Sequence, residues 1–250
     1  MEKKYKSELN CPICDIFIYD GDKNHINCII PYNKKMLKNK INSYYILDKH
    51  HYEEIYDKIL PPIYKGWPGF KVINTNIIYP DILVYDIYWR QLWYEEFKTT
   101  LIFPKWDLLI KLKNIINNDK IVQINSNPCM YGWLLSKIGC EIYTTNKDII
   151  FDCYSMMEFI DVNETFKKYE NCNTLLIELN DVELNQDLDN FNGNKIIIIG
   201  QNRYFGKFKL KGKDRYFYDE KWLLLDTFYI DSWFGIDDQI NIYERNNDYT

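Results

Sequence analysis

Residues 120–135 read Lys-Ile-Val-Gln-Ile-Asn-Ser-Asn-Pro-Cys-Met-Tyr-Gly-Trp-Leu-Leu, and this stretch decides the fold. The apolar residues 121–124 predict a buried strand, the polar residues after them predict a turn, and the segment that ends at Gly139 predicts a helix. A second short strand is predicted over residues 141–145. This order of strand, turn, helix and strand begins a parallel α/β unit of the kind that binds nucleotides.

Glycine is missing from the turn at the places where such a unit needs it. Glycines let the backbone come close to a bound cofactor. The corresponding positions hold Asn125, Asn127 and Cys129. The pattern that predicts the fold therefore lacks the residues that would predict its usual function.

Four further segments have strand patterns. Short, nearly continuous apolar runs at 174–179 and 195–200 are typical of parallel strands buried on both faces. Residues 222–230 and 239–243 predict two antiparallel strands near the C-terminus. The sheet is therefore expected to be mostly parallel, with an antiparallel pair at its end.

Helices are predicted from spacing and from proline. Apolar residues at helical spacing predict a helix over 85–97, and Pro104 is well placed as the first residue of another. His50 and His51 are followed by two glutamates, which resembles a metal-binding pattern. Adjacent histidines point to different sides of a helix, so we predict a surface helix there instead.

The composition of the chain changes near Pro61. Residues 1–60 are polar and rich in lysine, and the following run of proline, glycine and aromatic residues is typical of a linker or a surface loop. We expect an N-terminal extension over 1–60, a linker or draped loop over 61–80, and the main domain over 81–250.

Composition and charge limit the class of protein. The 250 residues are 46% apolar, enough for a sizeable core, and abundant Asn, Ile, Lys and Tyr are typical of an AT-rich genome. A net charge of −5 argues against a general attraction to nucleic acid, although residues 34–40 and 203–215 are locally basic. We interpret both basic stretches as solvated surface.

The sequence favours an intracellular protein, cytoplasmic or nuclear. No apolar run approaches the roughly 20 residues that span a bilayer, and no hydrophobic segment follows the charged N-terminus as in a signal peptide. Seven cysteines, an odd number without a signal peptide, indicate reduced thiols.

A cluster of cysteine and histidine near the N-terminus is a candidate zinc site. Cys11, Cys14, His25 and Cys28 have the spacing Cys-x2-Cys-x10-His-x2-Cys, which is compatible with tetrahedral zinc. The alternative is a pair of short strands carrying free thiols. In the zinc hypothesis the ion holds together a segment that has little apolar material of its own.

Five segments together form a recognisable pattern: the proline-entered helix at 103–106, the loop 123–133, the helix ending at Gly139, the strand 141–145, and the tail formed by Trp233-Phe-Gly-Ile-Asp237 and Ile242-Tyr-Glu-Arg245. Through these segments the chain resembles, from about residue 85 to 245, the class I S-adenosylmethionine-dependent methyltransferases. The resemblance implies a Rossmann-like α/β fold. Its mostly parallel central sheet is closed by the C-terminal antiparallel strand pair, and a small N-terminal extension is added.

The departures from the family pattern concern the cofactor site. The family loop reads roughly Glu-x-Gly-x-Gly-x-Gly, and the matching residues here are Gln123, Asn125, Asn127 and Cys129. The acidic residue that holds the ribose hydroxyls in the family corresponds to Asn146. The resemblance assigns these five positions to a degenerate site, and we expect S-adenosylmethionine not to bind.

No catalytic residue is assigned. The family has a Pro-Pro-aromatic element after the fourth strand, whereas residues 177–181 read Ile-Glu-Leu-Asn-Asp. Glu178 and Asp181 are weak candidates for a base, and surface carboxylates beside a strand end are the simpler interpretation.

Three functions remain open. We favour a degenerate, non-catalytic methyltransferase-like protein with a binding, regulatory or structural role and with a protein or nucleic-acid partner. The first alternative is an active methyltransferase with an unusual cofactor loop. The second is a zinc-bearing adaptor that binds nucleic acid through its N-terminal segment.

Overall fold

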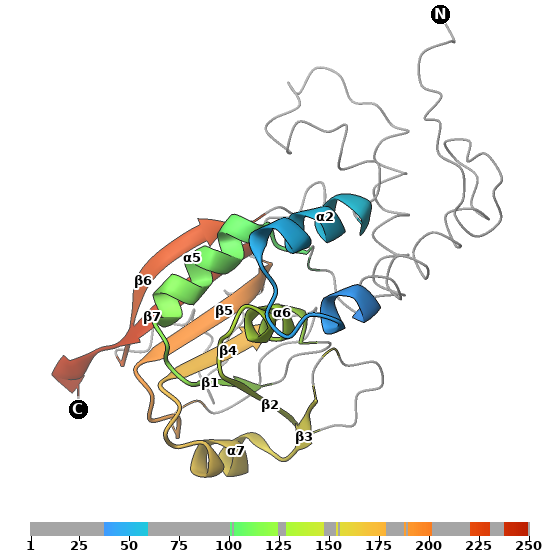
Figure 1. Ribbon diagram of the computed structural model, residues 1–250. Helices are drawn as coiled ribbons and strands as arrows, with labels where there is room; N and C mark the ends of the chain where they lie inside the picture. The colour runs from blue at the N-terminus through green and yellow to red at the C-terminus, as the bar shows by residue number, and fades with distance from the viewer. Residues whose placement is uncertain are drawn as a thin grey trace, which may run out of the picture.

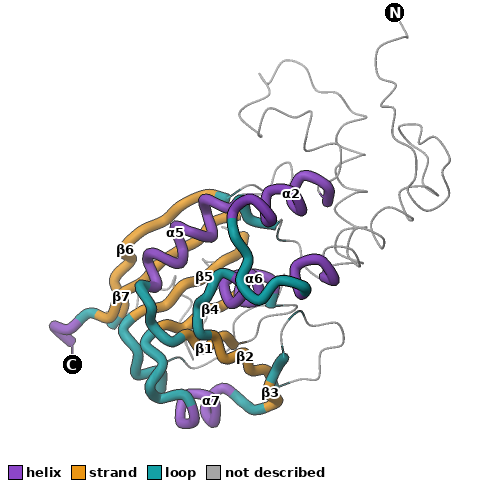
Figure 2. Tube along the Cα trace, in the orientation of Figure 1, coloured by secondary structure: helices purple, strands orange, loops and turns teal. Residues whose placement is uncertain are grey.

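A computed structural model describes ten parts of the chain. They are residues 38–59, 101, 103–124, 129–147, 154, 156–178, 188, 190–201, 221–230 and 238–249. These parts build a sheet with helices packed against it, as the ribbon in Figure 1 and the tube in Figure 2 show.

The sheet has seven strands in the order β3-β2-β1-β4-β5-β7-β6. The strands are β1 (Ile121–Ile124), β2 (Ile142–Asn146), β3 (Glu158–Phe159), β4 (Thr174–Glu178), β5 (Lys195–Gln201), β6 (Trp222–Tyr229) and β7 (Asp238–Arg245). The first five are parallel to one another, and β7 is antiparallel to both β5 and β6. This arrangement confirms the expected Rossmann-like, class I methyltransferase-like fold with its C-terminal antiparallel pair.

Helices cover both faces of the sheet. They are α2 (Lys49–Ile59), α5 (Trp106–Ile116), α6 (Met130–Lys137) and α7 (Val162–Lys168), and a short 3-10 helix, η1 (Asn247–Tyr249), follows β7. The helix predicted to begin at Pro104 is present as α5, although it begins at Trp106, two residues later. The predicted surface helix around His50 is confirmed as α2.

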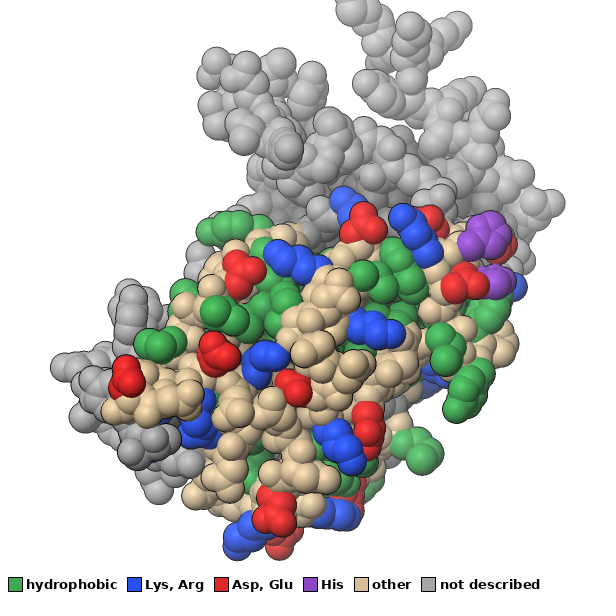
Figure 3. Space-filling model, turned by 60° about the vertical axis from the view of Figure 1, so that its left-hand side comes forward, with side chains coloured by type: hydrophobic (Ala, Val, Ile, Leu, Met, Phe, Trp, Pro, Cys, Tyr) green, Lys and Arg blue, Asp and Glu red, His purple; other side chains and the backbone are tan. Residues whose placement is uncertain are grey.

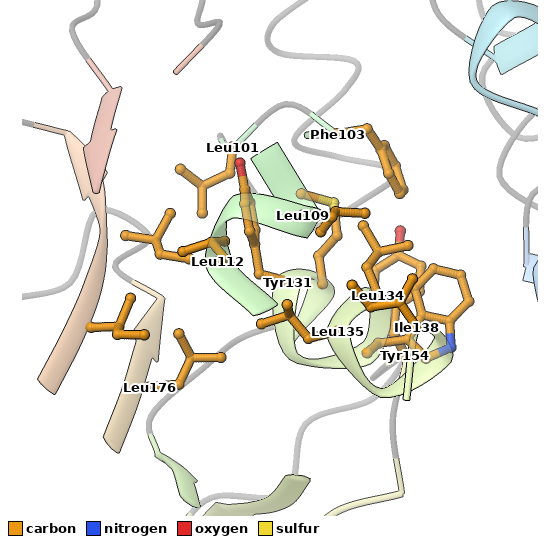
Figure 4. Packing of buried hydrophobic residues seen from close by; sticks show 14 of the residues in the cluster. Leu101, Phe103, Leu109, Leu112, Tyr131, Leu134, Leu135, Ile138, Tyr154 and Leu176 are labelled. Atoms are coloured by element: carbon orange, nitrogen blue, oxygen red, sulfur yellow. The ribbon is translucent and has the colours of Figure 1, made fainter. Parts of the chain in front are cut away.

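Alternation along the strands divides the core into two parts. Leu176 and Ile197 face the cluster that contains α2, α5 and α6, and Figure 4 shows this packing around Tyr131 and Leu109. Neighbouring strand residues such as Leu175 face the other cluster, to which α7 contributes a phenylalanine. Strands buried on both faces explain why the sequence shows continuous apolar runs rather than alternation.

The described part of the N-terminal extension, residues 38–59, contributes to the hydrophobic cluster that contains α2, α5 and α6. Ile41, Leu47, Tyr52 and Ile55 are buried there beside α5 and α6. The Tyr52 hydroxyl donates a hydrogen bond of 2.5 Å to the carbonyl oxygen of Pro104. This segment therefore shares its core with the sheet.

Several predictions made from the sequence meet different outcomes. The elements β3 and α7 were not predicted, because a strand of two residues and a helix of seven carry little periodicity. The predicted helix over 85–97 and the predicted linker over 61–80 lie outside the described residues. Within the described part of the chain, no helix is long and apolar enough to cross a membrane.

Asp119 joins three strands at the end of the sheet where β1, β4 and β5 begin. Its Oδ2 accepts hydrogen bonds from Asn173 Nδ2 at 3.0 Å and from Thr174 Oγ1 at 3.1 Å, and lies 3.4 Å from Lys195 Nζ. The carboxylate therefore links the starts of β1, β4 and β5 through a half-buried ion pair.

Replacing Asp119 by alanine is expected to lower the free energy of unfolding by about 2 kcal/mol, because three donors lose their acceptor. Urea unfolding measures the change. Asp107→Ala is the matched control, since the Asp107 side chain is 90% exposed and should change the free energy by no more than about 0.5 kcal/mol. Equal effects of the two substitutions would show that Asp119 does not hold the strands.

Candidate functional site

The candidate site lies where β1, β2 and β4 end and α6 begins. In open α/β sheets, ligands bind outside the carboxyl ends of the strands, beside the helix that follows the first strand. The structure brings Gln123, Cys129, Asn146 and Glu178 to this edge. Four of the residues singled out from the sequence are thus gathered around the start of α6.

Cys129 keeps the backbone conformation of a glycine. It precedes α6 with φ 65° and ψ 38°, in the left-handed region, and its side chain is fully buried. A residue with a Cβ is less stable in this conformation than glycine by about 1–2 kcal/mol. The chain therefore combines, just before α6, a backbone conformation that favours glycine with a buried side chain.

Gln123 is a buried polar side chain that links three elements. Its Nε2 donates a hydrogen bond of 2.6 Å to Glu178 Oε1, and its Oε1 accepts one of 3.3 Å from Thr144 Oγ1. Both the amide and its partners are shielded from water. Gln123 thus makes its side-chain hydrogen bonds within the protein.

Glu178 is also buried, and it contacts the first turn of α6. Its Oε1 accepts a hydrogen bond of 3.1 Å from the backbone N–H of Gly132, and its side chain is 1% exposed. The interpretation of Glu178 as a surface carboxylate is therefore wrong. The sequence shows only a carboxylate that ends an apolar run, and the strand end is covered by α6.

Burial raises the pKa of Glu178 to about 7 from its ordinary value of 4.5. Hydrogen bonds from the Gly132 N–H, the Gln123 amide and the Tyr131 and Met130 N–H groups act in the opposite direction and favour the ionised form. The loss of hydration outweighs these bonds. Near neutral pH the carboxyl group is consequently divided between its two protonation states.

Gly132 is a residue of this site that the sequence did not single out. A Cβ added to it would lie 1.8 Å from Gln123 Oε1, so only glycine lets the helix rest on the glutamine side chain. The signal in the sequence was a single glycine in the first turn of the helix that follows a buried strand.

Asn146 ends β2, at the same end of the sheet, and is 8% exposed. The residues that lie outside the described parts of the chain are Asn125, Asn127, Asp181, and the candidate zinc ligands Cys11, Cys14, His25 and Cys28. Among the residues that are described, no group of three or more His, Cys, Asp and Glu side chains is placed to hold a metal ion.

The C-terminal Tyr-x-Arg pattern has a structural role. Arg245 Nε donates a hydrogen bond of 2.9 Å to the Gly193 carbonyl oxygen, and its Nη2 donates to the Phe191 carbonyl oxygen. Its guanidinium also lies 4.6 Å from the ring centre of Trp222. These contacts hold the end of β7 against the loop before β5. They lie where the parallel strands begin, whereas α6 begins at the end of the sheet where these strands end.

Charged side chains of both signs are mixed on the face shown in Figure 3. Lys111 Nζ lies 3.7 Å from Asp226 Oδ2 and 3.6 Å from the centre of the Phe228 ring. Of the two basic stretches in the sequence, residues 203–215 and most of 34–40 lie outside the described parts.

The strain at Cys129 can be measured with a pair of substitutions. Cys129→Gly and Cys129→Ala both remove the thiol, but only glycine removes the strain, so the glycine variant should be more stable by about 1 kcal/mol. Urea unfolding gives the difference. At Ser136, within the same helix, the order should reverse, because alanine is the better helix residue by about 1 kcal/mol. An alanine variant at 129 at least as stable as the glycine variant would contradict the left-handed conformation.

Glu178 should also make stability depend on pH. A raised pKa in the folded state means that its contribution is fully present below pH 4.5 and is lost as the pH rises through about 7. The loss amounts to about 3 kcal/mol at most, by 1.36 kcal/mol for each pKa unit. Glu178→Gln cannot ionise and should lose this dependence.

Urea unfolding of both proteins at pH 5 and pH 8 compares the two slopes. Glu244→Gln, at an exposed position on β7, serves as the control and should keep the slope of the unmodified protein. The same slope in Glu178→Gln and in the unmodified protein would show that Glu178 is not the titrating group.

Among the comparisons with known proteins, only the search of solved structures finds similar proteins. A scan against protein-family models found no match, and a search of curated proteins found none either. Solved structures that resemble this chain include a protein of the NADB-Rossmann superfamily from Streptococcus agalactiae, with 9% identity, a TM-score of 0.36, and coverage of 54% of this chain and 68% of that one. A candidate S-adenosylmethionine-dependent methyltransferase from Streptococcus mutans has 14% identity, a TM-score of 0.40, and coverage of 58% and 50%.

TrmN from Thermus thermophilus has 9% identity, a TM-score of 0.36, and coverage of 56% of this chain and 48% of its own. The chain thus spans about half the length of these last two proteins. Because the TM-scores are below 0.5, the fold assignment rests on the strand order and direction. On that basis the chain has a class I methyltransferase-like fold.

Proposed function

We propose that this chain is a non-catalytic protein that uses the methyltransferase-like fold as a binding or structural scaffold and does not bind S-adenosylmethionine. The observation that carries the proposal is the start of α6. There a buried cysteine side chain stands in the place of a glycine, and the first turn of the helix already has an acceptor from Glu178.

The residues at this site fit the cofactor poorly for two physical reasons. The side chain of Cys129 is fully buried at a position where the family keeps the backbone bare for the cofactor. Asn146 lacks the charge with which the family's acidic residue accepts hydrogen bonds from the ribose hydroxyls. Loss of one charge-assisted hydrogen bond weakens binding by about 1.5–3 kcal/mol, and a steric obstruction can cost more than that, so the two effects together weaken binding about 100-fold or more.

Burial also argues against Glu178 as a catalytic base. A base must come within hydrogen-bond reach of the substrate proton that it removes. The Glu178 carboxyl group is 1% exposed and is bonded to Gln123 and to α6. Its raised pKa, which is often a sign of an active site, follows here from burial inside the protein.

The edge strand β6 supports a binding role with a protein partner. Leu223, Leu224, Leu225 and Tyr229 are all more than half exposed there, between 55% and 69%. In the sheet formed by the described residues, β6 is an edge strand, and the outer backbone groups of an edge strand are not paired within that sheet. We therefore propose β6 as the surface on which a partner is to be sought.

Isothermal titration calorimetry tests the loss of cofactor binding. A 100-fold loss from a dissociation constant of about 1 μM gives about 100 μM. Titrating the full chain with S-adenosylmethionine and S-adenosylhomocysteine should therefore give no binding tighter than this. An active class I methyltransferase in the same buffer is the positive control. A micromolar dissociation constant for either ligand would overturn the proposal and favour an active enzyme with an unusual loop.

A further inference from the structure

The first N–H groups of α6 need acceptors that the helix itself does not supply. The initial turn of any α-helix leaves its N–H groups without intrahelical partners, and a side chain before the helix commonly accepts one of them. Cys129, which holds that position here, makes no such side-chain hydrogen bond. The acceptor must come from elsewhere in the fold.

Glu178 supplies this acceptor from a distant strand. Its Oε1 lies 3.1 Å from the Gly132 nitrogen, across a separation of 46 residues in sequence. The Met130 and Tyr131 N–H groups also bond to the carboxyl group and favour its ionised form. The partial positive charge at a helix N-terminus adds to this attraction.

The carboxyl group is held in position by a second set of contacts. Gln123 Nε2 donates to the same Oε1 at 2.6 Å, and Thr144 on β2 orients the glutamine through its Oε1. Gly132 allows the helix to approach so closely that a Cβ there would overlap Gln123. The chain of contacts thus runs from β2 through β1 and β4 into α6.

We propose that the carboxyl group of Glu178 is a built-in ligand of helix α6. In nucleotide-binding α/β domains, the N-terminus of the helix after the first strand receives an anionic group from a bound molecule. Here β4 delivers an acid group of the protein itself to that place. Glu178 is accordingly a positioning residue, which fixes α6 on the sheet through the protein's own carboxyl group.

This inference rests on the proposed function only in requiring no external ligand at the site. It also makes a prediction that an ordinary buried core residue does not make. If the carboxyl group acts as a ligand, its removal should leave a cavity at the helix N-terminus that a small carboxylate from solution can fill. Formate is the smallest such probe.

The experiment compares Glu178→Ala with Glu244→Ala, which removes an exposed carboxylate from β7. Thermal unfolding of each full-length variant is followed at pH 8 in sodium formate and in sodium chloride of equal ionic strength. At a formate concentration about ten times its dissociation constant, the midpoint of Glu178→Ala should rise by roughly 3–5 °C relative to chloride. The midpoints of the unmodified protein and of Glu244→Ala should be the same in the two salts.

Equal responses of the two alanine variants to formate would overturn the inference, because the cavity would then have no affinity for a carboxylate. If Glu178→Ala does not fold in chloride, folding that appears only in formate supports the inference, and a chain that stays unfolded in formate counts against it.

A second measurement uses the unmodified protein. The Gly132 amide proton resonance should shift with pH as the contacting carboxyl group ionises, and the shift should vanish in Glu178→Gln. A Gly132 resonance that does not respond to pH would overturn the contact itself. Cofactor binding in the calorimeter together with formate rescue would reject the proposed function and leave this role of Glu178 standing.

Discussion

The structure depends on which groups accept hydrogen bonds from the backbone N–H groups at the N-terminus of α6, inside the protein. A buried backbone N–H without an acceptor destabilises a fold by about 1–3 kcal/mol, and a helix start presents several at once. Glu178 meets this requirement from β4, while α6 directly follows β1. One side chain therefore fixes the helix on two neighbouring strands, and the absence of a side chain at Gly132 lets the helix lie against Gln123.

This arrangement balances two opposing terms. Taking a carboxyl group out of water penalises its ionised form, and N–H donors at a helix start favour that form. The pKa of about 7 shows that the desolvation is larger, although the donors offset part of it. A carboxyl group with such a pKa is often found in an active site, and the burial of Glu178 is sufficient to account for this shift.

Proteins that share a strand order can differ in function. The strand order is that of a methyltransferase-like fold, and Cys129, just before α6, has the left-handed conformation in which glycine is favoured. Beside it, the side chains of Gln123 and Glu178 bond to each other. A single fold supports many functions because function depends on such side chains rather than on the strand order.

The sequence predicted those parts of the fold that carry strong local signals. Strands β1, β4 and β5 are continuous apolar runs because helices cover both of their faces, and Pro104 marks the entry to α5. The helix α7 is too short for periodicity, but Asp161, which accepts from the Glu164 N–H at 2.9 Å, was a capping signal in the sequence.

The contact between Glu178 and α6 was beyond prediction from the sequence. It joins residues that are 46 positions apart, and a carboxylate at the end of an apolar run is equally consistent with a surface position. The identities of Gln123 and Cys129 indicated only that these positions hold neither a carboxylate nor a glycine. The three-dimensional arrangement adds that Gln123 and Glu178 are bonded to each other and that Glu178 accepts from α6.

A crystal structure of the full chain grown with an excess of S-adenosylhomocysteine tests the central claim most directly. The expected electron density shows Glu178 Oε1 within hydrogen-bond distance of the Gly132 nitrogen and no adenosine beside Cys129. Density for the ligand at the start of α6, with the Glu178 carboxyl group turned away from the helix, would contradict it.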